Sequence, residues 1–165
     1  MYVHESLFCF FFIQKNIKTK MTNILILCTG NSCRSQIAHG YFERFTDGRK
    51  VKVYSAGVET HGVNPKAIAT MAGDGINIAQ NTSNNIDEYF DIAFDYVLTV
   101  CDNAKERCPY FPSKAIFRHY NFPDPAKATG SDEEIMTQFD AVRDEIKQYV
   151  LAFVTEYKIG LDIIK

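Results

Sequence analysis

The chain of 165 residues has no tryptophan, no excess of basic side chains and no long apolar segment. The formal net charge of -2 argues against a general nucleic-acid binder, which usually carries a surplus of lysine and arginine. It leaves a small anionic substrate open, because one loop can be positive while the whole chain is not. Repeats, low-complexity tracts and long linkers are also absent, so the length predicts one domain with a buried core.

Zinc-ligand spacing is missing as well. The cysteines are Cys9, Cys28, Cys33, Cys101 and Cys108, and no pair has the spacing of a zinc motif. The four histidines form no cluster with ligand-like spacing, so we expect no metal site. A chain of this size does not need disulfide cross-links. An odd number of cysteines therefore favours catalytic or redox-active thiols in a reducing compartment.

Residues 1–20 differ in composition from the rest of the chain. The apolar run from Leu7 to Ile13 is too short to span a bilayer, and neither a basic segment nor a small-residue cleavage site marks a signal peptide. Met21 precedes the first core segment and would be a natural start. We predict that residues 1–20 are a dispensable extension and that residues 21–165 form the domain. A short interfacial anchor is the alternative.

Strand and helix patterns alternate along the remaining chain. Short apolar runs predict strands at residues 24–27, 52–55, 95–100 and 115–118. Helical spacing predicts helices at residues 34–45, 65–73, 86–90 and 102–107, and a long one after Ser131, where Glu134 completes a capping box. This order predicts a single α/β domain whose four-stranded parallel sheet is flanked by helices.

The loop after the first strand carries the clearest chemical signal. A strand, a tight loop and a helix together aim backbone N–H groups and a helix N-terminus at an anion. The same positive field would lower the pKa of the Cys28 thiol and make it a nucleophile, and the Arg34 guanidinium matches a tetrahedral oxyanion. The alternative is a buried cysteine beside a surface arginine. We expect the substrate to be bound by Thr29, Gly30, Asn31, Ser32, Cys33, Arg34 and Ser35.

Three residues of this loop have further predicted roles. Ser35 could hydrogen-bond the Cys28 thiolate and so hold its pKa down. Asn31 tolerates a left-handed backbone conformation and could brace the loop. Cys33 is interpreted as a small packing residue.

Two more side chains follow strands at the same edge of the predicted sheet, the edge where open α/β sheets bind ligands. Asp124, between two prolines, could protonate a leaving oxygen, although an aspartate beside proline is also a common turn residue. Cys101 and Cys108 would lie roughly 10 Å apart on a helix, which is too far for a disulfide. They are either two buried thiols or a redox pair whose bond requires the intervening segment to unwind.

These motifs resemble one group of enzymes. The loop from Cys28 to Ser35 is similar to the phosphate loop of the low-molecular-weight tyrosine phosphatase superfamily. Segments 54–65 and 119–125, together with the Cys101 and Cys108 pair, narrow the resemblance to the thioredoxin-coupled arsenate reductases. The resemblance covers about residues 21–157.

The resemblance implies an arsenate reductase that works through a thiol relay. Cys28 would attack arsenate while Asp124 helps water to leave. Cys101 would then attack Cys28, release arsenite and form a Cys28–Cys101 disulfide. Cys108 would attack Cys101 next, and thioredoxin would reduce the Cys101–Cys108 bond. Phosphate and sulfate would compete with arsenate, and the protein would be a cytoplasmic monomer with neither nucleic-acid nor membrane partners.

The chain departs from the family pattern at three positions. Some relatives hold potassium beside the phosphate loop with carboxylates, where this chain has His39 and Asn84. We therefore expect no tightly bound cofactor. Tyr120 replaces the usual tryptophan, which predicts an aromatic lid that gives no tryptophan fluorescence.

Two other functions stay open at this point. A protein tyrosine or small-molecule phosphatase would use the same loop and hand the covalent adduct to water. It predicts that Cys101→Ser and Cys108→Ser leave the principal activity intact, whereas a reductase would lose multiple turnovers with either change. A non-enzymatic sensor would bind phosphate or report oxidation through its thiols, which makes poor use of a nucleophile, oxyanion donors and an acid.

Overall fold

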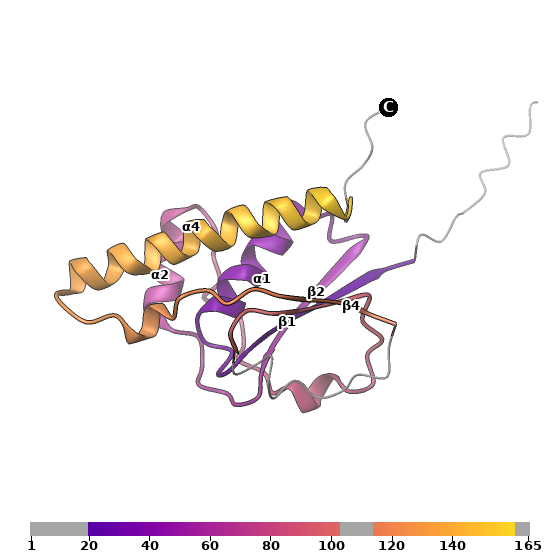
Figure 1. The fold of residues 1–165 in the computed structure, drawn as a ribbon, viewed down its shortest axis with the longest axis horizontal. Helices are drawn as coiled ribbons and strands as arrows, with labels where there is room; N and C mark the ends of the chain where they lie inside the picture. Colours follow the sequence, from indigo (N-terminus) through magenta and orange to yellow (C-terminus); the bar gives the residue numbers. More distant parts are fainter. Residues whose placement is uncertain (1–19, 103–113, 161–165) are drawn as a thin grey trace, which may run out of the picture.

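In the computed structural model, which describes residues 20–102 and 114–160, strands and helices alternate along the chain (Figure 1). The strands are β1 (Thr22–Cys28), β2 (Val51–Gly57), β3 (Tyr96–Thr99) and β4 (Ile116–His119). The α-helices are α1 (Arg34–Phe45), α2 (Pro65–Gly73) and α4 (Asp132–Glu156), and the 3-10 helices are η1 (Ile86–Tyr89) and η2 (Pro125–Lys127). Helix α1 spans its predicted residues, and each strand differs from its prediction by one or two residues at either end.

The four strands form one parallel sheet in the order β2-β1-β3-β4, which confirms the predicted fold class. The central strand β1 is the most buried, since Ile24 to Leu27 are at most 1% exposed. Its register with β3 places Leu27 beside Thr99, and β4 in turn places His119 beside Thr99. All strands therefore end at one edge, and the registers decide which residues meet there.

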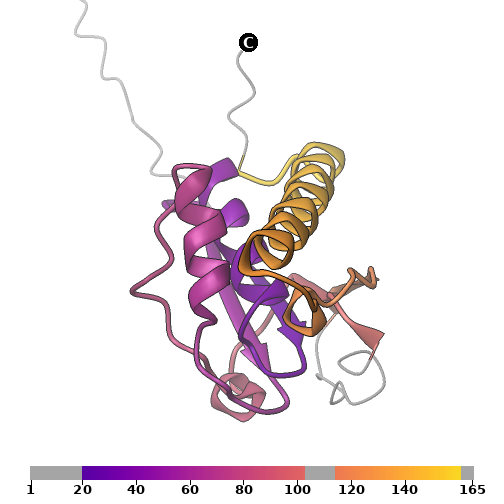
Figure 2. The same cartoon turned by 90° about the vertical axis from the view of Figure 1, so that its left-hand side faces the viewer.

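Helices α1 and α4 lie on one side of the sheet, whereas η1 lies on the other (Figure 1). The end-on view shows α2 and α4 flanking α1 (Figure 2). Phe153 of α4 ties these layers together, because its ring packs edge-on against Phe42 of α1 at 5.7 Å and against Tyr96 of β3 at 5.5 Å between centroids. Apolar residues at helical spacing form the inner face of α4, which is buried at Phe139, Val142, Ile146, Val150 and Phe153 and only partly buried at Ile135 near its start.

The predicted helix starts are confirmed by their capping bonds. The Asn64 side chain accepts a hydrogen bond from the backbone N–H of Lys66, and Pro65 occupies the first turn of α2. Ser131 and Glu134 bond reciprocally at the start of α4. Each cap satisfies N–H groups that a helix leaves without internal partners, which is why these helices begin where they do.

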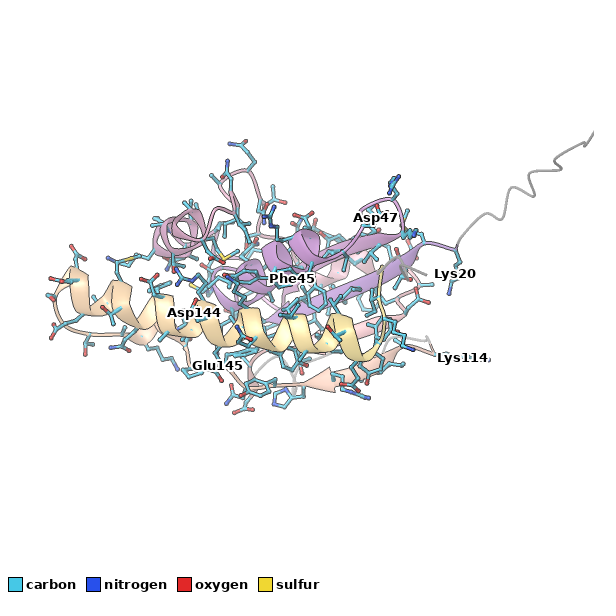
Figure 3. The ribbon with its side chains drawn as sticks, turned by 90° about the horizontal axis from the view of Figure 1, so that it is seen from above. Lys20, Phe45, Asp47, Lys114, Asp144 and Glu145 are labelled. Carbon is cyan, nitrogen blue, oxygen red and sulfur yellow. The ribbon has the colours of Figure 1, made fainter. Side chains whose placement is uncertain are left out.

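Two predictions lie largely outside the described residues. These are the helical turns at residues 102–107, of which only Asp102 is described, and the extension at residues 1–20, of which only Lys20 is described. Lys20, labelled where β1 begins in Figure 3, donates from Nζ to Asp95 Oδ1 at 2.6 Å. Among the described helices, none is long and apolar enough to cross a membrane.

Candidate active site

A cavity of about 850 Å³ opens beside the carboxyl edge of the sheet. Its walls include Cys28, Arg34, Cys101 and Asp124, so three separate segments meet there. The strand register explains part of this meeting. Because Leu27 pairs with Thr99, the residues two positions further along each strand also come together. The Thr29 hydroxyl accordingly lies 3.3 Å from the Cys101 sulfur.

The loop after β1 has several of its carbonyl groups turned outward. The carbonyl oxygens of Thr29, Gly30 and Ser32 accept hydrogen bonds from backbone N–H groups of the segment 59–64 at 2.9–3.0 Å. In a trans peptide the C=O and the following N–H point in opposite directions. The N–H groups after these carbonyls therefore point toward the inside of the loop, which is the arrangement that binds an anion.

Two glycines permit this close packing of the loop. A Cβ atom on Gly57 would lie 2.6 Å from the Thr29 carbonyl oxygen and 2.8 Å from the Asn31 nitrogen. A Cβ atom on Gly30 would lie 2.4 Å from Nδ1 of His61, whose side chain also borders the cavity. The ring of His61 is thus a wall of the loop, although its sequence position alone gave no chemical role.

Asn31 braces the loop, as predicted. Its φ angle of 45° is left-handed and its side chain is fully buried. Its Nδ2 donates to Ser35 Oγ at 2.9 Å, and its Oδ1 accepts from the Asn84 N–H at 2.9 Å and from Gln36 Nε2 at 3.1 Å. Gln36 also donates to the Thr82 carbonyl, so the loop is fastened to the segment before η1. Sequence reasoning missed Gln36, which occupies an ordinary helix position.

Arg34 is held at the back of the cavity by two hydrogen bonds. Nη1 donates to the Phe122 carbonyl oxygen and Nη2 donates to Asp124 Oδ2, both at 3.1 Å. The residue is only 8% exposed, and its Nε is buried without a hydrogen-bond partner among the described residues. An unpaired buried guanidinium donor is costly, so Arg34 has spare capacity for an anion inside the loop.

Asp124 faces Arg34 from the loop after β4. Its Oδ1 accepts a hydrogen bond from the Ala126 N–H at 3.2 Å, which caps η2, while Oδ2 accepts from Arg34. The carboxylate side chain lines the cavity and remains 25% exposed. Its backbone is fixed by the flanking prolines, as the sequence indicated.

The predicted lowering of the Cys28 pKa is wrong for this arrangement of side chains. A hydrogen bond with the Cys101 thiol and burial both raise the pKa of Cys28. The Arg34 charge and the Thr29 backbone N–H act in the opposite direction but do not prevail. Ionisation of one thiol opposes ionisation of the other, so the first proton is lost from the Cys28 and Cys101 pair as a unit. The sequence could not show this coupling, because it did not show the contact.

Two further predicted residues of the loop, Cys33 and Ser35, are both buried. Burial raises the pKa of Cys33 to about 11, and its side chain belongs to the hydrophobic core, as expected for a packing residue. Ser35 is fully buried and receives the bond from Asn31; its predicted bond to the Cys28 sulfur stays a prediction. Cys28, Cys33 and Cys101 form no disulfide. Cys9 and Cys108 lie outside the described residues.

The residues at the family's potassium position have other partners. His39 Nδ1 lies 3.0 Å from Ser55 Oγ, and its Nε2 lies 3.3 Å from a Glu43 carboxylate oxygen. The Asn84 amide nitrogen donates to Glu88, and its oxygen accepts from the Thr82 hydroxyl at 2.7 Å. Hard cations prefer several free oxygen ligands, so this imidazole and committed amide do not fit potassium. In residues 20–102 and 114–160, no group of three or more His, Cys, Asp or Glu side chains could hold a metal ion.

The predicted aromatic lid is not formed by Tyr120. Its ring packs against Phe122 at 4.4 Å and Tyr149 at 5.1 Å between centroids. Its hydroxyl donates to Glu145 on α4, a residue labelled in Figure 3. The side chain therefore joins β4 to α4 and does not border the described cavity.

A polar cluster beside Cys101 was missed by sequence reasoning. Asp102 accepts hydrogen bonds from His119 and Asn121, and His119 also contacts Thr99. These residues come from two separate stretches of chain, 99–102 and 119–121, and each alone is an ordinary polar residue at or just after the end of a strand. The only signal available in advance was that both strands end with polar residues at one edge of the sheet.

Comparisons with known proteins agree with this geometry. The family model described as low molecular weight phosphotyrosine protein phosphatase matches residues 23–160. The arsenate reductase of Halalkalibacterium halodurans is 47% identical over 130 residues, which cover 79% of this chain and 93% of that protein. The arsenate reductase of Bacillus subtilis is 46% identical over 123 residues, which cover 74% and 88% respectively.

Solved structures give the same result. An arsenate reductase in its oxidized state has a TM-score of 0.71 at 28% identity and covers 82% of this chain and 98% of its own. Another arsenate reductase, in a phosphate-binding state, has a TM-score of 0.66 at 30% identity with the same coverage. The chain therefore belongs to the low-molecular-weight phosphotyrosine protein phosphatase family, in the group that includes the bacterial arsenate reductases.

Proposed function

We propose that the protein is an arsenate reductase that converts arsenate to arsenite through Cys28, Cys101 and Cys108. The observation that carries this proposal is the contact between the Cys28 and Cys101 thiols in one cavity. A phosphatase needs one nucleophilic thiol, whereas a reductase needs a second thiol within reach of the first. The curated relatives named arsenate reductase support the same choice.

The first step uses the loop and Arg34. The inward N–H groups and the unpartnered Nε of Arg34 bind the arsenate oxygens. The Cys28 thiol gives its proton to a bound arsenate oxygen as the sulfur attacks the arsenic, and Asp124 gives a proton to the oxygen that leaves as water. The product is a covalent sulfur–arsenic adduct in which the arsenic keeps the oxidation state of arsenic(V).

The second step is the reduction. Cys101 attacks the Cys28 sulfur, a sulfur–sulfur bond forms and the sulfur–arsenic bond breaks. The electron pair of the broken bond stays on arsenic, which leaves as arsenite. Two thiols have then been oxidised to one disulfide, and arsenic(V) has been reduced to arsenic(III).

The third step returns Cys28 to its thiolate. Cys108 attacks the Cys101 sulfur, and thioredoxin reduces the resulting Cys101–Cys108 disulfide.

We further propose that the protein acts as a cytoplasmic monomer without a resident cofactor. A single peak at the monomer mass in light scattering after gel filtration checks the oligomeric state.

A coupled assay tests the proposal. The full chain with thioredoxin, thioredoxin reductase and NADPH should consume NADPH when arsenate is added, with one NADPH per arsenite formed. Cys101→Ser and Cys108→Ser should each abolish multiple turnovers, although Cys101→Ser should still form the first adduct. Failure to consume NADPH above the rate without arsenate contradicts the proposal.

The phosphatase alternative rests on the same loop and on the family match. It is separated by comparing hydrolysis of p-nitrophenyl phosphate with arsenate reduction in the two cysteine variants. A reductase loses arsenate turnover and keeps weak hydrolysis, because hydrolysis needs only Cys28, Arg34 and Asp124. If hydrolysis is fast in the original protein and arsenate turnover is absent, the phosphatase is correct.

A further inference from the structure

Asp102 directly follows Cys101, and both of its carboxylate oxygens accept hydrogen bonds from residues at and after the end of the neighbouring strand β4. His119 Nε2 lies 3.1 Å from Oδ1, and Asn121 Nδ2 lies 2.6 Å from Oδ2. His119 is the last residue of β4, and Asn121 lies in the loop that leads to Asp124. The carboxylate therefore connects the end of the Cys101 strand to the loop that carries the general acid.

The His119 ring extends this connection to the other side of Cys101. Its Nδ1 lies 2.8 Å from the hydroxyl oxygen of Thr99, two residues before Cys101. A carboxylate can only accept, so Nε2 donates to Asp102, and the other ring nitrogen pairs with the Thr99 hydroxyl. One ring thus bridges the residues before and after Cys101.

We propose that Asp102, acting through His119 and Asn121, is a positioning residue that holds the Cys101 thiol against the phosphate loop. The proposal rests on the relay given above, in which the Cys101 sulfur must approach the Cys28 sulfur in line with the sulfur–arsenic bond. The opposite side of Cys101 is already fixed, because its sulfur lies 3.3 Å from the Thr29 hydroxyl. Asp102 fixes the backbone on the other side of Cys101, and two fixed contacts are needed to give the sulfur a defined direction of attack.

The exposure of Asp102 argues against a mainly structural role. Its side chain is 61% exposed, whereas that of His119 is 25% exposed. Exposed ion pairs and hydrogen bonds contribute little to global stability. Loss of the carboxylate should therefore leave the melting temperature nearly unchanged while it loosens the few residues around Cys101.

The test measures two rates in each variant, and their ratio is the readout. All variants carry Cys108→Ser, so that the Cys28–Cys101 disulfide is the final product. The first rate is arsenite release in a single turnover without reductant, followed by rapid quench. The second is hydrolysis of p-nitrophenyl phosphate, which does not need Cys101. Peptide mapping by mass spectrometry identifies the disulfide that forms.

Asp102→Ala should lower the ratio of arsenite release to hydrolysis by about tenfold or more, since misplacement by about 1 Å can cost a reaction about a hundredfold. Asp102→Asn keeps one acceptor oxygen and should recover part of this loss. Asn121→Ala should have a smaller effect, and the Asp102→Ala/Asn121→Ala double variant should be no slower than Asp102→Ala alone. Asp91→Ala, a change at an exposed aspartate before β3, is the matched control and should leave the ratio unchanged.

A second oxidant keeps the inference independent of arsenate. Diamide, which takes two electrons from a pair of thiols, should form the Cys28–Cys101 disulfide more slowly in Asp102→Ala than in the chain with Asp102. If arsenite release is absent before Asp102 is changed but diamide shows this difference, the relay function fails and the positioning role stands. An unchanged ratio together with an unchanged diamide rate, or a fall in melting temperature that accounts for both losses, overturns the inference.

Discussion

The Thr29 hydroxyl lies 3.3 Å from the Cys101 sulfur, across the junction of the two central strands. This contact follows from the pairing of Leu27 with Thr99, which brings the ends of β1 and β3 level. A shift of one residue in that register would turn the Cys101 side chain to the other face of the sheet. The chemistry proposed for the two thiols therefore depends on a backbone register.

Removing the Cys101 thiol should lower the pKa of Cys28. The hydrogen bond with Cys101 is the largest cause that raises this pKa, and Arg34 and the Thr29 N–H remain to lower it. Below the pKa the thiolate fraction rises with pH, so the alkylation rate of Cys28 in Cys101→Ala should level off at a lower pH. A pKa that is lower by one unit gives about tenfold more thiolate at pH near 7, partly offset by the lower nucleophilicity of that thiolate. Iodoacetamide labelling read by peptide mass spectrometry measures this, and an unchanged profile contradicts the coupling.

Arg34→Lys should reduce kcat/KM for arsenate by about a hundredfold or more, the usual cost of losing an oxyanion donor. Lysine cannot reproduce the bonds to Phe122 and Asp124 together with the spare Nε. Arg49→Lys is the matched control, because Arg49 forms an exposed pair with Asp47. Steady-state kinetics measure kcat/KM in both variants, and an equal fall in Arg34→Lys and Arg49→Lys would contradict a role for Arg34 in oxyanion binding.

Gly30→Ala should weaken arsenate binding, because the new Cβ would lie 2.4 Å from Nδ1 of His61 and push the loop or the ring aside. KM should rise by about tenfold, which corresponds to 1.4 kcal/mol of lost binding. Adding His61→Ala should recover part of this loss, while His61→Ala alone keeps the Gly30 loop unstrained. No recovery in the double variant would show that the strain lies elsewhere in the loop.

Acid should lower the free energy of unfolding through Asp74. This residue caps the end of α2 and accepts hydrogen bonds from Tyr41 of α1 and Lys147 of α4. Hydrogen bonds from Lys147 and Tyr41 lower the pKa of Asp74 below its ordinary value of 3.8. A lowered folded-state pKa means that this stabilisation is present above pH 3.8 and is lost as pH falls through the folded value. Asp74→Asn should cost about 1 kcal/mol near neutral pH and less in acid.

Urea unfolding at several pH values checks this prediction. Tyr41→Phe is the control, because it removes one hydroxyl and keeps the stacked ring beside Phe45. Its loss should be smaller than that of Asp74→Asn, since the ion pair with Lys147 remains. Equal losses at every pH would contradict a role for the Asp74 charge.

Truncation tests the predicted extension. A chain that begins at Met21 should keep the melting temperature and the arsenate activity of the full chain, because the core begins at β1. A chain that begins at Lys20 is the matched partner, since it retains the exposed pair with Asp95, worth at most about 1 kcal/mol. A large loss in both chains would show that residues 1–19 contribute to the domain.

Local patterns were sufficient for most of the fold. The buried run at residues 24–27, the helix at 34–45 and the Ser131 capping box each depend on neighbours within a few residues. Parallel pairing then followed from the alternation of strands and helices. The short helix predicted at residues 86–90 is a 3-10 helix over Ile86–Tyr89, and the local sequence does not specify which kind of helix forms.

By itself, the sequence determined which chemical groups the site contains: Cys28 after a strand, Arg34 at a helix start, Asp124 between prolines and a thiol after the third strand. Only the tertiary structure decided their relations. It placed Cys101 against Cys28, which reversed the predicted direction of the Cys28 pKa, and it turned Tyr120 away from the cavity. The reason is that pKa values and side-chain directions depend on contacts between residues far apart in sequence, and those contacts are set by strand register and helix packing.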